Sequence, residues 1–162
     1  MCGIVGIVGD APVADRLVDA LKRLEYRGYD SAGVATLEGG AIARRRAEGK
    51  LGNLASKLGM EPLGGHIGIG HTRWATHGAP TETNAHPHAT ERVAIVHNGI
   101  IENFRELLED LARDGYRPQT QTDTESVALW VTREIDNGAE PELAVARTLK
   151  KLKGAFALAF MF

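Results

Sequence analysis

Residues 2–8 read CGIVGIV, a short, β-branched segment interrupted by glycines, and this pattern predicts a buried strand that begins at the chain terminus. Cys2 would then lie at a strand end. It follows Met1 directly, and a residue this small permits removal of the initiator methionine, which would leave a thiol and a free α-amino group on one residue. Because these groups have reference pKa values of about 8.5 and about 7.7–8.0, Cys2 would offer a nucleophile and a base near neutral pH. The alternative is that Cys2 is only a small buried residue that opens a strand.

The remaining pattern predicts a layered α+β domain. Apolar, β-branched runs at residues 32–37, 66–70, 92–97 and 155–162 predict further strands, several too apolar for a sheet with one face in water. Helical spacing of apolar residues appears at residues 12–26, 101–114 and 141–153. Another helix follows Thr122, which has capping-box spacing to Glu125, and ends near Asn137-Gly138. A length of 162 residues, 43% of them hydrophobic, fits one domain with its sheet covered on both sides.

Composition excludes several function classes. A net charge of -2 offers no field for nucleic acid, so the run Arg44-Arg45-Arg46 is interpreted as a solvated strand or loop edge. A single cysteine excludes an internal disulfide and a zinc site built from several thiolates. No apolar stretch approaches the roughly 20 residues of a membrane span, so we expect no membrane partner and a cytoplasmic location. The glycines at 3, 6 and 9 and the pair Gly49-Lys50 match no nucleotide-binding motif, and we expect no cofactor.

The histidines invite a metal interpretation, because all six lie in one third of the chain: His66, His71, His77, His86, His88 and His97. They fall on different predicted strands and loops, and no His-Glu-x-x-His helix is present. We therefore expect no metal site, and interpret His66, His71 and His97 as hydrogen-bonded residues near strand ends.

Three other positions can carry chemistry. Asn98-Gly99 is by itself a hairpin signal, but a helical pattern follows it; facing Cys2, its amide and backbone N–H would hold an oxyanion. Arg73 can bind a carboxylate in a two-point contact, or form an ordinary ion pair. Asp123 can bind an ammonium group, or simply favour the start of a helix. Together, Arg73 and Asp123 would recognise the two charged ends of an α-amino acid.

Six segments in order resemble one known pattern: CGIVGIVG (2–9), RLEYRGYDSAG (23–33), HTRWATHG (71–78), NAHPH (84–88), VHNGIIEN (96–103) and TDTE (122–125). Together they resemble the class II glutamine amidotransferase domain, an N-terminal nucleophile hydrolase. The resemblance extends over essentially the whole chain and implies a four-layer αββα fold.

The resemblance also implies roles for individual residues. Cys2 would be the nucleophile and its α-amino group the general base, while Asn98 and Gly99 would form the oxyanion hole. L-Glutamine would be bound through its carboxylate by Arg73 and through its ammonium by Asp123. The other expected site residues are Thr76, His77 and Gly99 in the pocket, Arg27 and Gly28 beside the Cys2 amine, and Trp74 in a loop over residues 73–81 that closes on the substrate.

The implied reaction is hydrolysis of glutamine to glutamate and ammonia through a Cys2 thioester. Two other groups of the family are amidophosphoribosyltransferases and asparagine synthetases. The sequences of residues 23–33 and 71–78 instead resemble the members that pass the ammonia to a sugar-phosphate isomerase region, which aminates fructose 6-phosphate. Residues 1–162 would then be a glutaminase domain, incomplete at its C-terminus, of a homodimeric enzyme whose isomerase region lies beyond Phe162. A non-catalytic glutamine-binding module remains the alternative from another class.

Overall fold

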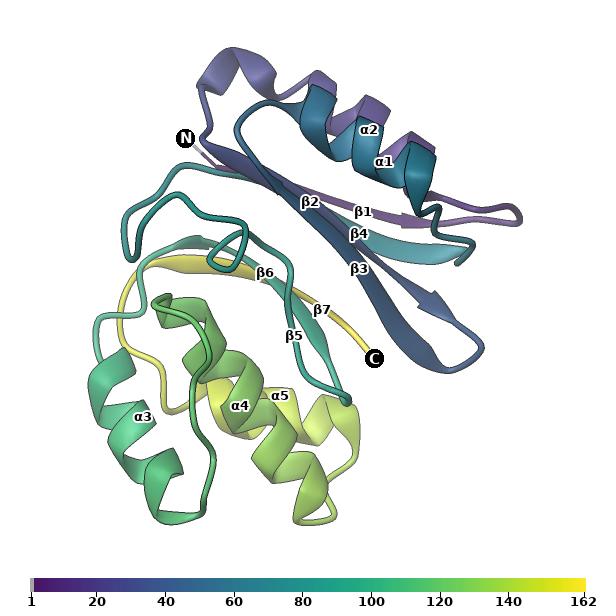
Figure 1. The fold of residues 1–162 in the computed structure, drawn as a ribbon. Helices are drawn as coiled ribbons and strands as arrows, with labels where there is room; N and C mark the ends of the chain where they lie inside the picture. Colours follow the sequence, from purple (N-terminus) through teal and green to yellow (C-terminus); the bar gives the residue numbers. More distant parts are fainter. Residues whose placement is uncertain (1) are drawn as a thin grey trace.

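Two antiparallel sheets lie face to face between two layers of helices in the computed structural model, which describes residues 2–162 (Figure 1). The strands are β1 (Gly3–Val8), β2 (Ser31–Glu38), β3 (Ala41–Glu48), β4 (Ile67–Arg73), β5 (His88–Ala89), β6 (Ala94–Gly99) and β7 (Phe156–Met161). The helices are α1 (Ala14–Lys22), α2 (Leu51–Met60), α3 (Phe104–Arg113), α4 (Asp123–Asp136) and α5 (Pro141–Leu149), with a short 3-10 helix, η1, at Glu25–Arg27.

The first sheet has the strand order β1-β4-β2-β3, and α1 and α2 cover its outer face (Figure 1). Alternation along β4 decides which side chains face which layer. Gly70 faces α1, because a Cβ added there would lie 3.2 Å from Leu21 Cδ1. Its neighbours Ile69 and His71 therefore point the other way, toward the second sheet, and Arg73 shares their face of the strand.

The second sheet has the order β5-β6-β7 and is covered by α3, α4 and α5 (Figure 1). Buried Ile95, Leu111 and Val131 belong to the core between this sheet and its helices. A separate apolar cluster, which includes Ile69 and Val96, fills the space between the two sheets. The resulting order of helix, sheet, sheet and helix layers confirms the expected αββα arrangement with both faces of each sheet covered.

The structure excludes one alternative that the sequence left open and corrects one local prediction. Asn98 and Gly99 make no hairpin turn, since both belong to β6 and pair with Ala157 and Phe156 of β7. Thr122 does precede α4, but its side chain makes no cap hydrogen bond; its hydroxyl lies 3.0 Å from His88 Nε2 instead. The sequence pattern also missed β3, α2 and the two-residue strand β5.

The run Arg44-Arg45-Arg46, for which the sequence left open a strand or a loop edge, lies on β3, the edge strand of the first sheet. It is not simply solvated. Arg44 donates to Pro87 O at 3.1 Å, and Arg46 donates to Thr83 O and Ala85 O, each at 2.9 Å. Burial lowers the pKa of Arg46 to about 10. These guanidinium groups therefore attach the segment before β5 to the first sheet.

Candidate active site

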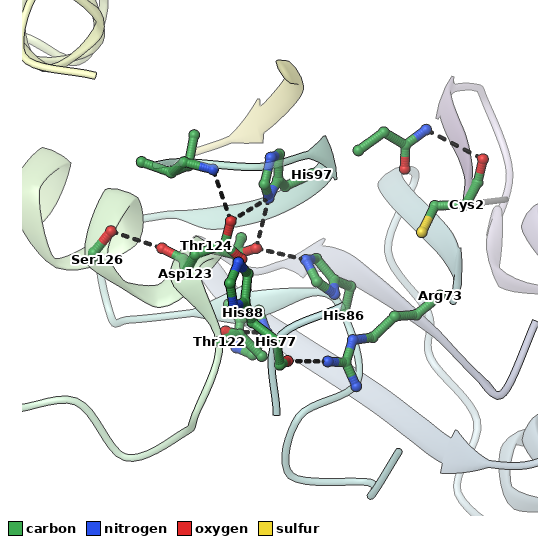
Figure 2. A network of polar contacts seen from close by, with 12 residues as sticks. Cys2, Arg73, His77, His86, His88, His97, Thr122, Asp123, Thr124 and Ser126 are labelled. Atoms are coloured by element: carbon green, nitrogen blue, oxygen red, sulfur yellow. Dashed lines mark hydrogen bonds and ion pairs between the residues drawn. The ribbon is translucent and has the colours of Figure 1, made fainter. Parts of the chain in front are cut away.

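A cavity of about 400 Å³ opens where β1, β4 and β6 approach the start of α4. Of the residues singled out in the sequence, nine line it: Cys2, Arg27, Arg73, Trp74, Thr76, His77, Asn98, Gly99 and Asp123. The fold thus brings together side chains that are up to 121 positions apart (Cys2 to Asp123). Figure 2 shows Cys2 and Arg73 in the same region as the polar network around Asp123 and Thr124.

Cys2 is placed by the pairing of β1 with β4. Gly3 lies opposite Thr72 in this ladder, so the residue before it reaches the end of β4. There the sulfur of Cys2 accepts a hydrogen bond from the Trp74 backbone N–H at 3.2 Å and lies 3.6 Å from the Trp74 carbonyl. Cys2 is only half-buried, and an N–H directed at the sulfur stabilises negative charge there. The geometry suits a nucleophile rather than a packed core residue.

Asn98 and Gly99 lie at the end of β6, close to Cys2 as the sequence interpretation required. The Asn98 side-chain N–H donates to the Cys2 carbonyl at 3.3 Å. Gly99 has φ 111°, and an added Cβ would lie 2.2 Å from Ala155 O, so no other residue fits without movement of the backbone. Both members of the pair border the cavity next to the sulfur.

Arg73 ends β4 and is only 3% exposed. Its guanidinium donates to the carbonyls of His77, of Gly78 at 3.3 Å and of Ala79 at 3.2 Å. Burial lowers the pKa of Arg73, and the nearby charge of Asp30 opposes that shift. Arg73 therefore brings a buried positive charge to the cavity and at the same time holds the loop that follows β4 (Figure 2).

Asp123 is the first residue of α4 and is 4% exposed. Its carboxylate accepts the Ile101 backbone N–H at 2.8 Å and lies 3.9 Å from His97 Nδ1. A carboxylate at a helix N-terminus is favoured by the helix dipole, and here it also lines the cavity. Arg73 and Asp123 thus give the cavity one buried group of each charge.

Of the other predicted site residues, Trp74, Thr76, His77 and Arg27 line the cavity, and Gly28 does not. Trp74, 55% exposed, and Thr76 lie in the loop after β4, and the ring of His77 lies 5.2 Å from that of Phe104. Asp30 holds this loop by accepting the Ala75 N–H at 2.5 Å. Gly28 has φ 74°, and a Cβ there would lie 3.1 Å from the Trp74 ring, which places η1 and the loop side by side.

The sequence interpretation missed five cavity residues: His86, His97, Ile100, Thr122 and Thr124. Thr124 is central, because its hydroxyl lies 2.9 Å from His86 Nε2 and 2.8 Å from His97 Nδ1 (Figure 2). Burial lowers the pKa of His86 well below its usual value. Burial also lowers the pKa of His97, although the negative charge of Asp123 raises that pKa in part. Both rings are therefore neutral. His97 joins α4 to β6, and His86 joins α4 to the segment before β5. The TDTE motif was the available signal for Thr122 and Thr124.

The histidines do form a cluster, although not the metal site considered above. His71, His86, His88 and His97 are buried, and the rings of His71 and His86 stack at 4.3 Å. Within residues 2–162 no three His, Cys, Asp or Glu side chains are placed to hold a metal ion. Within the same residues, no helix has the length and apolarity that a bilayer crossing requires.

Comparisons with known proteins agree with this geometry. A family model described as a glutamine amidotransferase domain matches residues 71–162. The chain is 68% identical over its whole length to the glutamine–fructose-6-phosphate aminotransferase (isomerizing) of Mesorhizobium japonicum and 66% identical to that of Brucella suis. It spans 27% of the length of each of these relatives.

Solved structures give the same result at the level of the fold. The glutamine phosphoribosylpyrophosphate amidotransferase of B. subtilis matches with a TM-score of 0.84 and 25% identity, covering 99% of this chain and 35% of that one. A glutamine aminotransferase class-II domain protein from Silicibacter pomeroyi, 16% identical, shares the fold with a TM-score of 0.66, over 99% of this chain and 72% of its own. The predicted four-layer sandwich of N-terminal nucleophile hydrolases is confirmed, and the chain belongs to the glutamine amidotransferase domain family.

Proposed function

We propose that this chain carries out the glutaminase half-reaction of an amidotransferase, hydrolysing L-glutamine to glutamate and ammonia with Cys2 as the nucleophile. The observation that supports this most directly is that the Cys2 sulfur, the Asn98-Gly99 pair, Arg73 and Asp123 line one cavity of about 400 Å³. That volume suits a single small amino acid, and its two buried charges match the two charges of the substrate.

Substrate binding follows from these charges. In the proposal, Arg73 holds the α-carboxylate and Asp123 the α-ammonium, while Thr76, His77 and Gly99 border the bound molecule. With both charged ends of the amino acid held, its side-chain carboxamide can reach Cys2 and Asn98, which line the same cavity. Two fixed points also orient the carboxamide carbon for attack, which lowers the entropic part of the barrier.

The first chemical step forms a bond between the Cys2 sulfur and the carboxamide carbon, while the thiol proton passes to the α-amino group of Cys2. The carbonyl π electrons move onto oxygen, and the Asn98 side-chain N–H and the Gly99 backbone N–H hold this oxyanion. Each such donor contributes roughly 100 to 1,000-fold to the rate. The Trp74 N–H donates a hydrogen bond to this sulfur at 3.2 Å and so helps to fix its position for attack.

The second step breaks the carbon–nitrogen bond. The α-ammonium of Cys2 returns the proton to the leaving nitrogen, ammonia departs, and a thioester of Cys2 remains. Water then adds to the thioester, giving up a proton to the α-amino group, and glutamate leaves as the thiol is restored. The base exists only where Met1 has been removed; Met1 lies outside the described residues, and we predict that a chain retaining it is inactive.

The loop over residues 73–81 closes on the substrate in this proposal, and Arg27 and Gly28 orient the Cys2 amine. The relatives that match over this whole chain are named glutamine–fructose-6-phosphate aminotransferases. On that basis we assign the ammonia to the amination of fructose 6-phosphate to glucosamine 6-phosphate by the rest of a longer, cytoplasmic and homodimeric enzyme. The continuation of the glutaminase domain beyond residue 162 stays a prediction.

Labelling of Cys2 tests the proposal. The full-length protein is incubated with 6-diazo-5-oxo-L-norleucine, a glutamine-mimicking electrophile, and peptide mass spectrometry locates the adduct. We expect one adduct on Cys2, protection by excess L-glutamine, and no adduct or glutamate release in Cys2→Ala. Reversible glutamine binding without adduct or glutamate release would overturn the proposal in favour of a non-catalytic binding module.

A further inference from the structure

His71 lies in the middle of the first sheet, facing the second. It belongs to β4, between Ile4 of β1 and Gly33 of β2, and it is completely buried. Its Nε2 lies 2.9 Å from the His97 carbonyl and 2.9 Å from Asn98 Oδ1. The proposed mechanism gives His71 no task, yet its ring contacts the side chain assigned to the oxyanion.

The contacts fix the tautomer of this ring. Both neighbours of Nε2 are oxygen acceptors, so Nε2 must carry a hydrogen. Burial lowers the pKa of His71 to about 4, so the ring is neutral at physiological pH and its Nδ1 has no hydrogen. Among the described residues, Nδ1 has no hydrogen-bond partner, so no contact requires a hydrogen on that atom. His71 therefore presents one fixed donor to Asn98.

A fixed donor also fixes the orientation of the Asn98 amide. The two ends of a carboxamide are nearly the same shape, and hydrogen bonds decide which end faces which neighbour. Here Oδ1 faces the His71 donor, and Nδ2 faces the Cys2 carbonyl at 3.3 Å. If the amide were flipped, its N–H groups would face the His71 N–H, and its oxygen would face the Cys2 carbonyl oxygen. Both hydrogen bonds would become repulsive contacts.

We propose that His71 is a positioning residue that holds the Asn98 amide with its N–H groups toward Cys2, so that a developing oxyanion meets a donor and not the amide oxygen. This inference rests on the proposed glutaminase function. It assigns to a buried histidine, which does not line the cavity, control over the orientation of one of the two oxyanion donors.

The test uses the full-length protein and separates kcat from KM for glutamate release. His71→Leu removes the donor at similar volume, and we expect kcat to fall about 10 to 100-fold while KM for glutamine stays within about threefold, because a flipped Asn98 costs up to one oxyanion donor. His71→Gln can place an amide N–H near the position of Nε2, and His71→Asn is too short to do so. Gln should restore kcat to within about fivefold of the wild type, and Asn should not.

Coupling to Asn98 distinguishes this role from a purely structural one. In an Asn98→Ala background, His71→Leu should lower kcat by less than about twofold further, because two residues that act as a unit are non-additive. His88→Leu is the matched control: it removes another buried histidine, bonded to Thr122 and not to Asn98. His88→Leu should change kcat by the same factor in the wild-type background and in the Asn98→Ala background. If His71→Leu does not fold, the comparison of Gln with Asn decides alone.

Two results would overturn the inference: a kcat within twofold of wild type in His71→Leu, or an equal loss with and without Asn98. Equal kcat for the Gln and Asn variants would do the same. These results differ from a failure of the proposed function, in which the wild-type protein itself releases no glutamate.

Discussion

The carboxylate of Asp123 accepts the backbone N–H of Ile101 at 2.8 Å in a buried position. This bond joins the first residue of α4 to the chain just after Asn98 and Gly99 at the end of β6. One carboxylate therefore has two roles. It holds the chain directly after β6, next to the proposed oxyanion donors, and it supplies the negative charge of the cavity.

Asp123→Asn separates these two tasks. Asparagine keeps an oxygen for the Ile101 N–H but loses the charge, so we expect the fold to persist and KM for glutamine to rise about 10 to 100-fold, the cost of one charged hydrogen bond. Asp123→Ala should also leave the Ile101 N–H buried without a partner, which costs about 1–3 kcal/mol. Glutamate release against glutamine concentration, with hydrogen exchange of peptides near Ile101, measures both effects. Equal KM values for wild type and Asp123→Asn would contradict the assignment of the ammonium site.

Arg73→Lys tests the carboxylate site. A lysine keeps the charge but cannot bind a carboxylate at two points while holding the carbonyls of the loop, so KM for glutamine should rise about 10 to 100-fold. Arg45→Lys is the matched control, because Arg45 pairs with Glu61 on the surface at 2.9 Å, away from the cavity. That change should leave both KM and kcat within about twofold. Steady-state kinetics of the two variants decides between a substrate contact and an ordinary ion pair.

Gly99→Ala tests the close approach of β6 and β7. Its Cβ would lie 2.2 Å from Ala155 O at a φ of 111°, so the strand end must move, with a local loss of stability above about 2 kcal/mol and a fall in kcat of at least about tenfold. Gly138→Ala has a similar φ of 90° but nothing within 4 Å, so it should lose only about 1 kcal/mol and no activity. Hydrogen exchange of peptides from each region gives the local stabilities. Similar behaviour of the two variants would show that the contact with Ala155 is unimportant.

The buried histidines predict a loss of stability in mild acid. Burial lowers the pKa of His71 to about 4 and holds those of His86, His88 and His97 below their usual value. Near pH 6 the unfolded chain therefore binds protons that the folded chain does not. The free energy of unfolding is thus highest above a pH of about 6.5 and falls as the pH drops below this value. From pH 7.5 to 5.5 the opening free energy should decrease by about 1 kcal/mol through His71 alone, and the other three histidines should add to this decrease.

Hydrogen exchange of β4 and β6 peptides at the two pH values, corrected for the intrinsic exchange rate, measures this decrease. His88→Leu removes one of the four buried rings and should make the decrease smaller. His66→Gln changes an exposed histidine outside the cluster and should leave the decrease as it is in the wild type. A stability independent of pH over this range would contradict neutral burial of the four rings.

Periodicity predicted most of the elements that lie against a core, although it missed α2, in which Leu51, Leu54 and Leu58 are buried. The pattern of residues 2–8 anticipated β1, and the helices after residues 12, 101, 122 and 141 all exist with shorter ends. It missed β3 because Arg44 and Arg46 are polar yet face inward, where the carbonyls of the segment before β5 receive their N–H groups. A polar side chain that is buried against backbone oxygens looks, in a sequence, like one that faces water.

The candidate site was predictable where one residue type has one chemical use. An N-terminal cysteine, an Asn-Gly pair, an arginine and an aspartate indicated a nucleophile, oxyanion donors and two charged contacts, and all of them line the cavity. His97, His86 and Thr124 were not found, because their contacts depend on the meeting of two sheets with α4. Sequence spacing does not report which side chains approach from separate layers.

The place of Cys2 beside the cavity has a practical consequence for anyone who produces the protein. Its backbone nitrogen is one residue ahead of the β1 ladder, and its sulfur contacts the Trp74 backbone. An affinity tag fused at the amino end would therefore begin beside the cavity and convert the amine that acts as the base in the proposed mechanism into an amide. Purification handles belong at the opposite end, or upstream of a protease site that leaves cysteine as the first residue.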